Sequence, residues 1–405
     1  MSGHSLYLFD DARARDWAPL SLTRPVGEIL LGCLTLRARA ERVFSTPCQG
    51  HLVEGHVRHY REHDAPPGMG ADEVGSQGLR IVLSSRAVLA FQDLPRQWED
   101  GPVRLTIDGE TVGWRLPPGT PTPSRDHLSE PGGSVTGAAI ALRGSVLGDP
   151  WDLIAENAHR IETDAEHLRP GVDAHPAGVV RLGSHPLVLG DGATVEPGVV
   201  VDSRTGPVVL DDDVVVQGPA RLVGPLFVGR GTTILGGSVE RSSIGPVCKI
   251  RGEVSESVIL GYSNKAHDGF LGHALVGRWV NLGAMTTNSD LKNNYGTVRV
   301  WTPAGPRDTG LMKVGCFLGD HVRTGIGTLL NTGTVVGAGS NVFGSGSVPS
   351  MVAPFSWVSR DDTVPYRIEK FLEVAERAMA RRDVDLTDEL RLLYEGAWAA
   401  TAEWR

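Results

Sequence analysis

The chain has 405 residues, more than one ordinary domain requires, and this length predicts two domains. Its net charge of −9, without a long basic run, leaves no electrostatic footprint for nucleic-acid binding, while 40% hydrophobic residues are enough for packed cores. Glycine is in excess: 51 of the 405 residues are glycine, which is well above the usual share of about 7%. The composition therefore indicates a folded protein with many tight turns.

The cysteines show neither metal-ligand nor disulfide-framework spacing: Cys33, Cys48, Cys248 and Cys316. We expect them to be reduced thiols in a cytoplasmic protein. The first residues (MSGHSLYLFDD) contain no apolar signal region, and no apolar run reaches the roughly 18 residues of a membrane span. We therefore expect neither a secreted protein nor a membrane partner.

Residues 1–165 are predicted to form an α/β domain. Hydrophobic patterning predicts strands over residues 5–9 and 78–83, a β-hairpin over 103–114, and helices over 26–44 and 152–160. The hairpin turns at Asp108-Gly109, a pair that favours a type I′ turn. We assign residues 166–180 to a linker.

Residues 181–355 carry a repeat with a period of six. Two unbroken runs of buried-type residues show it: Leu210, Val216, Leu222, Val228 and Ile234, then Leu318, Thr324, Leu330, Val336, Val342 and Val348. Shorter runs keep the step at Leu189, Val195 and Val201, and at Phe270, Val276 and Leu282. Glycine often follows these positions and is expected to make the corner turns: Gly229, Gly277, Gly283, Gly319, Gly325 and Gly337. The step predicts a left-handed parallel β-helix of hexapeptide repeats rather than a glycine-rich sandwich with coincidental spacing.

The repeat is interrupted over residues 286–313, and a polar insertion inside a solenoid is usually a functional loop. After residue 355 the repeat ends. Residues 356–405 are predicted to contain helices over 365–380 and 386–398, which we expect to cover the open end of the solenoid.

Polar residues gather in residues 257–295 (SVILGYSNKAHDGFLGHALVGRWVNLGAMTTNSDLKNNY), more than a solenoid wall needs. This stretch resembles the acetyltransferase half of the bifunctional bacterial enzymes that make UDP-N-acetylglucosamine, and especially a divergent branch of sugar nucleotidyltransferases. The family pattern is Ser-Lys-x-x-His, aromatic-Leu-Gly, Val-Asn-Ile-Gly-Ala-Gly and an Asn-rich loop. The chain matches it from Ser263 to Tyr295. The resemblance is specific over residues 220–352 and diffuse over 1–165, where it implies a Rossmann-like nucleotidyltransferase fold.

The resemblance gives His267 the role of general base. An amine that attacks a thioester must lose a proton, and a neutral imidazole is the usual acceptor near neutral pH. The oxyanion formed in the attack would need a donor, which a backbone N–H at a coil corner can supply. Two other readings stay open: an ordinary loop histidine, or a metal site with Asp268 and His273, whose spacing matches no standard zinc pattern.

Further site residues follow from the same resemblance. The sugar would meet Asn281, and its phosphate would meet Arg251, Lys313 and Arg230, since arginine binds phosphate in a bidentate manner. Lys265 stands one place later than the family lysine, and Phe270 replaces a family tyrosine. The resemblance places acetyl-CoA and a neighbouring subunit near Ala284 and the Asn-rich loop with Asn288, Asn294 and Tyr295. The Asn-rich loop could instead be an ordinary cluster of turn residues. Likewise, Lys313 could instead be an ordinary solvated charge on the surface.

The amino-terminal region lacks the glycine-rich loop with which uridylyltransferases bind a nucleoside triphosphate. Arg13, Arg15 and Arg24 could instead supply cations around its phosphates, with Mg²⁺ as metal, although no metal-binding residue is identified. The sequence thus supports a nucleotidyltransferase-like fold better than that activity. The other reading of this region is a scaffold or a nucleotide-sugar-binding module.

We therefore expect a homotrimeric transferase that acetylates an amino-sugar-1-phosphate. The amino-terminal domain could then couple the acetylated sugar phosphate to a nucleotide. The first alternative is a sugar-1-phosphate nucleotidyltransferase whose β-helix serves only for oligomerisation. The second is a non-catalytic hexapeptide scaffold, which neither coenzyme A nor a nucleotide would stabilise.

Overall fold

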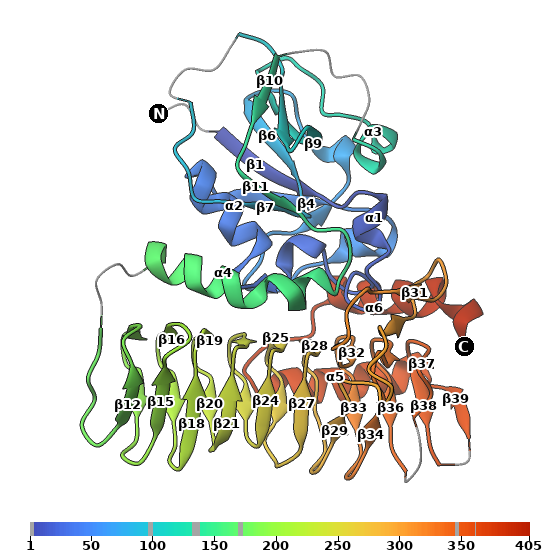
Figure 1. Ribbon diagram of the computed structural model, residues 1–405. Helices are drawn as coiled ribbons and strands as arrows, with labels where there is room; N and C mark the ends of the chain where they lie inside the picture. The colour runs from blue at the N-terminus through green and yellow to red at the C-terminus, as the bar shows by residue number, and fades with distance from the viewer. Residues whose placement is uncertain (1–3, 96–99, 132–137, 169–172, 345–347, 361) are drawn as a thin grey trace.

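The computed structural model describes residues 4–95, 100–131, 138–168, 173–344, 348–360 and 362–405. Figure 1 shows an α/β domain resting on one side of a long β-solenoid, with helix α4 (Asp152–Leu168) lying between them. In this part of the chain, no helix is both long and apolar enough to cross a membrane.

The amino-terminal domain is built on a seven-stranded mixed sheet. Its strands are β1 (His4–Phe9), β4 (Cys48–Leu52), β5 (Gly68–Met69), β6 (Leu79–Ser84), β8 (Val103–Ile107), β9 (Glu110–Leu116) and β10 (Ala138–Ala141). They lie in the order β10-β8-β9-β6-β1-β4-β5, with β1 parallel to both β4 and β6. Two small pairs join β2 (Leu30–Leu31) to β3 (Leu34–Thr35) and β7 (Ala87–Leu89) to β11 (Gly144–Val146). Short helices follow the strands: α1 (Ala12–Arg15), η2 (Gly55–His59), η3 (Ala71–Glu73) and α3 (Arg125–Ser129).

The predicted strands over residues 5–9 and 78–83 and the hairpin over 103–114 are confirmed, and Asp108 and Gly109 both have positive φ, as a type I′ turn requires. The predicted helix over residues 152–160 is also present as part of α4, which runs on to Leu168.

The predicted helix over residues 26–44 is wrong in its first half. The structure has a 3-10 turn η1 (Val26–Glu28) and the β2–β3 hairpin, and only then helix α2 (Leu36–Phe44). Gly32 has φ +69° between the two strands, and a side chain there would meet Arg160 and Asp164 of α4. Packing against α4 therefore overrides the local helical spacing.

The solenoid is a left-handed β-helix whose coils have three sides, and stacked coils form three parallel sheets. We name one sheet by its contact with the α/β domain and the other two by a residue each. The docked sheet faces the α/β domain and holds β13 (Leu187–Leu189), β16 (Val208–Leu210), β19 (Leu226–Val228), β22 (Ser243–Ile244), β25 (Val258–Gly261), β28 (Leu275–Arg278), β32 (Phe317–Leu318), β35 (Val335–Val336) and β37 (Met351–Val352).

The two other sheets complete each coil. The Asn281 sheet holds β14 (Thr194–Val195), β17 (Val215–Val216), β20 (Thr233–Ile234), β23 (Lys249–Ile250), β26 (Asn264–Lys265) and, beyond bridges through Asn281, β33 (Arg323–Thr324), β36 (Asn341–Val342), β38 (Ser356–Val358) and β39 (Thr363–Pro365). The Phe270 sheet holds β12 (Val180–Gly183), β15 (Val200–Ser203), β18 (Ala220–Val223), β21 (Gly237–Glu240), β24 (Glu253–Ser255) and β27 (Phe270–Gly272), followed by β29 (Thr287–Asn288) and β34 (Leu329–Leu330).

The long hexad runs lie inside the solenoid, as predicted. All five residues from Leu210 to Ile234 are fully buried, and the six from Leu318 to Val348 are at most 7% exposed. In the run that starts at Phe270, Val276 and Leu282 are buried as predicted, but the first inward position belongs to Leu271, and Phe270 is only half-buried.

The six glycines that follow the hexad positions do not make left-handed corner turns, contrary to the prediction, since none of them has a positive φ. Glycine is required at these positions for another reason. A Cβ at Gly337 would lie 2.3 Å from the backbone nitrogen of Pro354, and one at Gly283 would lie 2.6 Å from the carbonyl carbon of Gly325. These glycines allow the backbone of the next coil to approach closely.

The outer side of the docked sheet is apolar and packs against the α/β domain. Val209 and Phe227 of the sheet share one buried cluster with Leu31, Trp151 and Ile154 of that domain. The strands of this sheet are therefore buried on both faces, which makes the two domains one packed unit.

The carboxyl-terminal helices do not cover the end of the solenoid, contrary to the expectation. Helices α5 (Ile368–Ala380) and α6 (Asp388–Ala400) pack along the corner between the docked and Asn281 sheets, against Trp279 and Phe355, and also against Tyr60 of the α/β domain. A last turn, η4 (Ala402–Trp404), follows α6. On the last coil, β39 pairs antiparallel with β38.

Candidate functional site

His267 lies at the corner between the Asn281 and Phe270 sheets, in the turn that joins β26 to β27. Its side chain is exposed and takes no hydrogen bond or ion pair from the described residues. A free imidazole at a solvent-exposed corner can accept a proton from a bound substrate, which is the geometric requirement for a general base.

Lys265 occupies an inward position of the Asn281 sheet, in register with Ile250. It is 3% exposed, and its Nζ donates to the carbonyl oxygens of Arg251 at 2.7 Å and His267 at 3.1 Å. Burial lowers the pKa of Lys265 to about 8. The lysine therefore ties two successive corners together, and its ammonium group does not reach a substrate outside the coil.

Arg251 stands at the same corner one coil before His267. Its Nε lies 3.3 Å from Oδ1 of Asp268, and its Nη1 donates to the carbonyl oxygen of Leu235 at 3.0 Å. Both partners of the ion pair are largely exposed, at 48% for Arg251 and 63% for Asp268. Arg251 is thus the predicted phosphate ligand that the fold brings next to His267.

Phe270 begins the strand that leaves this corner. Its ring lies over Gly272, where an added Cβ would be 2.3 Å from the ring. Ala284 belongs to the same corner one coil later and is half-buried, and its carbonyl oxygen accepts from Gly327 N–H at 2.8 Å.

Asn281 is half-buried on the sheet that leads into the His267 corner. Its Oδ1 accepts from Asn264 Nδ2 at 3.4 Å, and Asn264 Oδ1 accepts from Arg382, which follows α5, at 2.8 Å. The predicted sugar ligand is therefore adjacent to β26, the strand that leads into the corner, and Asn264 links it to Arg382 after α5.

Arg230 and Lys313 are not brought to the His267 corner. Arg230 is exposed between the docked and Asn281 sheets, two coils earlier. Lys313 is exposed at the opposite edge of the Phe270 sheet, where it bridges Leu291. Within one chain, neither can share a ligand phosphate with Arg251.

The Asn-rich loop divides into one buried and two exposed predicted residues. Asn288 is 2% exposed, and its side chain accepts from Gly272 N–H and donates to Gly272 O, both at 2.8 Å. It thereby replaces the backbone ladder between two coils. Asn294 caps a turn at Gly296 N–H, and Tyr295 is 69% exposed with φ +55°.

The inserted segment that continues this loop reaches the α/β domain. It contains the hairpin β30 (Arg299–Val300) and β31 (Arg307–Asp308), which Figure 1 shows beside α6. Arg307 pairs with Asp149 at 2.5 Å and lies over the ring of Trp151. The segment therefore connects the solenoid to the other domain.

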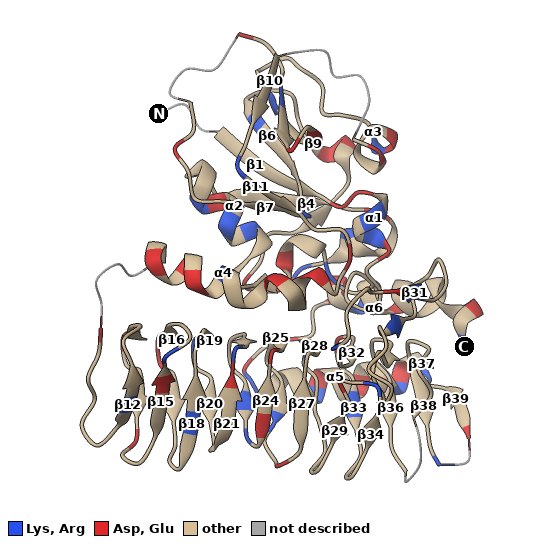
Figure 2. Ribbon diagram, in the orientation of Figure 1, with Lys and Arg blue, Asp and Glu red and all other residues tan. Residues whose placement is uncertain are grey.

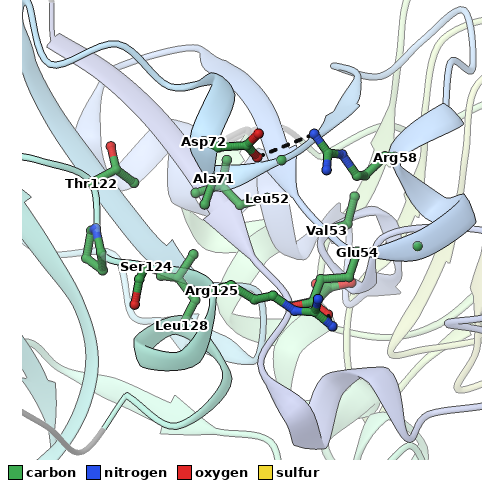
Figure 3. A pocket seen from close by; sticks show the side chains of 14 residues that line it. Leu52, Val53, Glu54, Arg58, Ala71, Asp72, Thr122, Ser124, Arg125 and Leu128 are labelled. Atoms are coloured by element: carbon green, nitrogen blue, oxygen red, sulfur yellow. Dashed lines mark hydrogen bonds and ion pairs between the residues drawn. The ribbon is translucent and has the colours of Figure 1, made fainter.

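The α/β domain has its own cavity, of about 310 Å³, where β1 and β4 end. In sheets with parallel strands, ligands bind at the carboxyl ends of the strands. Figure 3 shows Arg125 reaching toward Glu54, an ion pair of 2.5 Å, and Arg58 beside Asp72. Asp10 also lines the cavity, and its burial raises its pKa.

Arg13 and Arg15 lie near this edge, but carboxylates and carbonyls already engage them. Arg13 donates to Gly148 O at 2.6 Å and contacts Asp149 at 3.3 Å. Arg15 donates to Asp10 O at 3.0 Å and lies 3.5 Å from Glu54 of the cavity. Arg15 is therefore the predicted nucleotide-binding cation that lies closest to the cavity lining.

Arg24 is placed where no nucleotide can reach it. It has no exposed surface, and its Nη2 lies 2.7 Å from Asp320 of the solenoid and 3.2 Å from Glu62. Arg278 of the solenoid adds ion pairs to Glu62 and Asp64. Figure 2 shows basic and acidic residues meeting in the layer between the two domains.

Comparison with known proteins supports the assignment of residues 1–165 to a nucleotidyltransferase-like domain. Residues 6–172 match the model of a family described as sugar nucleotidyl transferase. The amino-terminal domain is similar to this family. A "bifunctional sugar-1-phosphate nucleotidylyltransferase/acetyltransferase" of Sulfurisphaera tokodaii is 34% identical over 120 residues, which cover 30% of this chain and 28% of that protein. The "bifunctional protein GlmU" of Methanococcus vannielii is 24% identical over 216 residues, which cover 53% of this chain and 47% of that protein.

The predicted family resemblance is thus confirmed, and both relatives are named as bifunctional. The matched regions span less than half of the length of each relative.

Magnesium does not fit the acidic residues after β1 in the α/β domain. Asp11 receives bonds from Arg86 and caps α1, while Asp10 accepts from Ser85 and from Val26 N–H. No group of three or more His, Cys, Asp or Glu that could hold a metal occurs among the described residues.

Sequence reasoning missed the cavity residues of the α/β domain, namely Glu54, Arg58 and Arg125. Glu54 stands two residues after the end of β4, and this position just past a strand was the available signal. Arg125 lies in a proline-rich stretch, residues 117–131, without a hydrophobic pattern, so no signal pointed to it.

Proposed function

We propose that the β-helix transfers an acetyl group from acetyl-CoA to the amine of an amino-sugar-1-phosphate, with His267 as general base. The observation that carries the proposal is the free imidazole of His267 at an exposed corner beside Arg251. Two relatives whose names include acetyltransferase or GlmU support the reaction class. The product would be a substrate for the sugar nucleotidyl transferase domain, giving a product of the UDP-N-acetylglucosamine type.

The chemistry follows from the residues at the corner. His267 accepts a proton from the amine as its nitrogen attacks the thioester carbonyl, and the thiolate of coenzyme A leaves. Arg251 would exchange its exposed partner Asp268 for the sugar phosphate, because a surface ion pair is weak and a phosphate carries more charge. Lys265 and Asn288 take no part in these steps, since both are buried and hold successive coils together.

The test follows release of free thiol when the protein meets acetyl-CoA and glucosamine-1-phosphate. We expect release with the wild type, and a loss of about 10²–10⁴-fold in kcat for His267→Ala. His185→Ala is the matched control, since it removes another exposed histidine of the solenoid and should keep the full rate. No thiol release with any amino-sugar phosphate would end the proposal, and a fully active His267→Ala would remove His267 from it.

A second candidate function is nucleotidyl transfer alone, with the β-helix serving only for oligomerisation. The cavity at the carboxyl ends of β1 and β4 favours it. Its signature would be pyrophosphate release from a nucleoside triphosphate and a sugar-1-phosphate, with no consumption of a thioester.

A further inference from the structure

A second histidine sits at the other end of β27, at the corner between the Phe270 and docked sheets. His273 Nδ1 lies 2.7 Å from Asp290 Oδ2, and the two side chains are 14% and 16% exposed. The opposite ring nitrogen, Nε2, takes no hydrogen bond from the described residues. A carboxylate at Nδ1 fixes the proton there, so Nε2 is left as the proton acceptor.

This pair is not needed to attach the inserted segment to the coil. Backbone bonds already do so, from Val314 N–H to Asp290 O at 2.9 Å and from Gly315 N–H to His273 O at 2.8 Å. The side chain of Asn288 adds two more bonds to Gly272. The His273–Asp290 pair is therefore an arrangement beyond what the fold requires.

We propose that His273 is a second catalytic residue of the acyl-transfer site, positioned by Asp290, and that it acts together with His267 of a neighbouring copy of the chain. This inference rests on the proposed function. The two histidines of one chain stand at opposite ends of β27, and six residues along an extended side reach about 20 Å, too far for one substrate nitrogen. A composite site needs two chains.

The surface around the two histidines fits such an assembly. Beside the His267 corner, Met285, Ile326 and Leu329 are 56%, 81% and 60% exposed. Beside the His273 corner, Tyr295 and Met312 are 69% and 57% exposed. Exposed apolar side chains near two different corners are what a head-to-tail ring can bury at each contact. If the ring axis is parallel to the solenoid axis, His267 of one copy and His273 of its neighbour lie at the same level along that axis.

The acyl-transfer reaction requires the removal of two protons and so can use two proton acceptors. An amino sugar is an ammonium ion near neutral pH, and its nitrogen loses two protons on the way to an amide. One proton must leave before the attack, and the other leaves as the C–N bond forms and the C–S bond breaks. One of these protons ends on the sulfur of coenzyme A, and the other goes to water. His267 and His273 each carry one of them.

The decisive variant is His273→Asn. His273 has φ +47°, a conformation that asparagine tolerates, and an asparagine amide can still donate to Asp290. The variant should therefore keep the fold, checked by an unchanged Tm, while kcat for thiol release falls about 10²–10⁴-fold at unchanged KM for acetyl-CoA. Asp290→Asn should lower kcat in the same way by a smaller factor. His185→Ala again serves as the control.

Mixing two inactive variants tests the composite site. His267→Asn and His273→Asn chains, unfolded and refolded together, should regain about a quarter of the wild-type rate, because random mixing pairs the intact halves at one contact in four. No recovery, with each variant inactive alone, would overturn the composite site, and a fully active His273→Asn would overturn the dyad. An inactive wild type would instead mean that the proposed function itself has failed.

Discussion

The segment after β1 and the coil around His267 carry the same kinds of residue, but the fold uses them in opposite ways. In the segment after β1, Asp10, Asp11 and the three arginines Arg13, Arg15 and Arg24 are bound to one another, to other side chains, to backbone groups or to the second domain, as Arg24 is to Asp320. At the His267 corner, the imidazole is free, and Arg251 is held by the exposed Asp268 and by one backbone carbonyl, that of Leu235. Availability, rather than residue type, separates a site from a structural cluster.

The largest effect should come from breaking the buried cluster between the domains. Asp320→Ala leaves Arg24 buried without its closest partner and also removes an acceptor from the hydroxyl of Thr23. Removing one partner of a buried ion pair costs about 3–5 kcal/mol, and we expect that loss in the free energy of unfolding measured with urea.

Asp72→Ala is the matched control, because Asp72 is 78% exposed in its pair with Arg58. Its removal should cost less than about 1 kcal/mol. Equal losses for the two variants would show that Arg24 is not locked between the domains, and would return it to the nucleotide-binding residues.

The sequence carried more information on the domain contact than periodicity alone revealed. Strands of the docked sheet read as continuous apolar runs, such as residues 187–189, 208–210 and 226–228, which is typical of a sheet buried on both faces. That signal could have predicted a covering layer. The pairing of Arg24 with Asp320 joins residues 296 positions apart, and only the docked arrangement reveals it.

A second effect separates the buried Lys265 from a substrate ligand. Burial lowers its pKa to about 8 in the folded protein, below the ordinary value of 10.5. Between these pH values the unfolded chain binds more protons, so this lysine makes stability rise with pH, by up to about 3 kcal/mol. The Lys265→Met variant lacks this rise. Unfolding measured from pH 7 to 10.5 should show the wild type gaining stability relative to the variant.

A flat difference across that pH range would mean that the lysine is solvated, and a raised KM for the acceptor would return it to the substrate-binding residues. The sequence could not place Lys265 inside the coil, because Ile250 and Lys265 are in register but fifteen positions apart, which breaks the step of six. The same irregular coils shifted Phe270 by one place. The sequence could single out His267 as a candidate because its motif is local, whereas the His273–Asp290 pair depends on two successive coils.

The smallest effect on stability, and the most informative for the site, is expected for Arg251→Gln. Its exposed pair with Asp268 contributes less than about 1 kcal/mol, so the free energy of unfolding should hardly change. A charged hydrogen bond to phosphate is worth about 1.5–3 kcal/mol, so KM for the amino-sugar phosphate should rise roughly 10–100-fold while KM for acetyl-CoA stays constant. Arg241→Gln is the control, since that arginine is 39% exposed in a similar pair with Glu256 at a different corner. If both variants raised KM equally, a diffuse positive field, rather than a phosphate site beside His267, would attract the substrate.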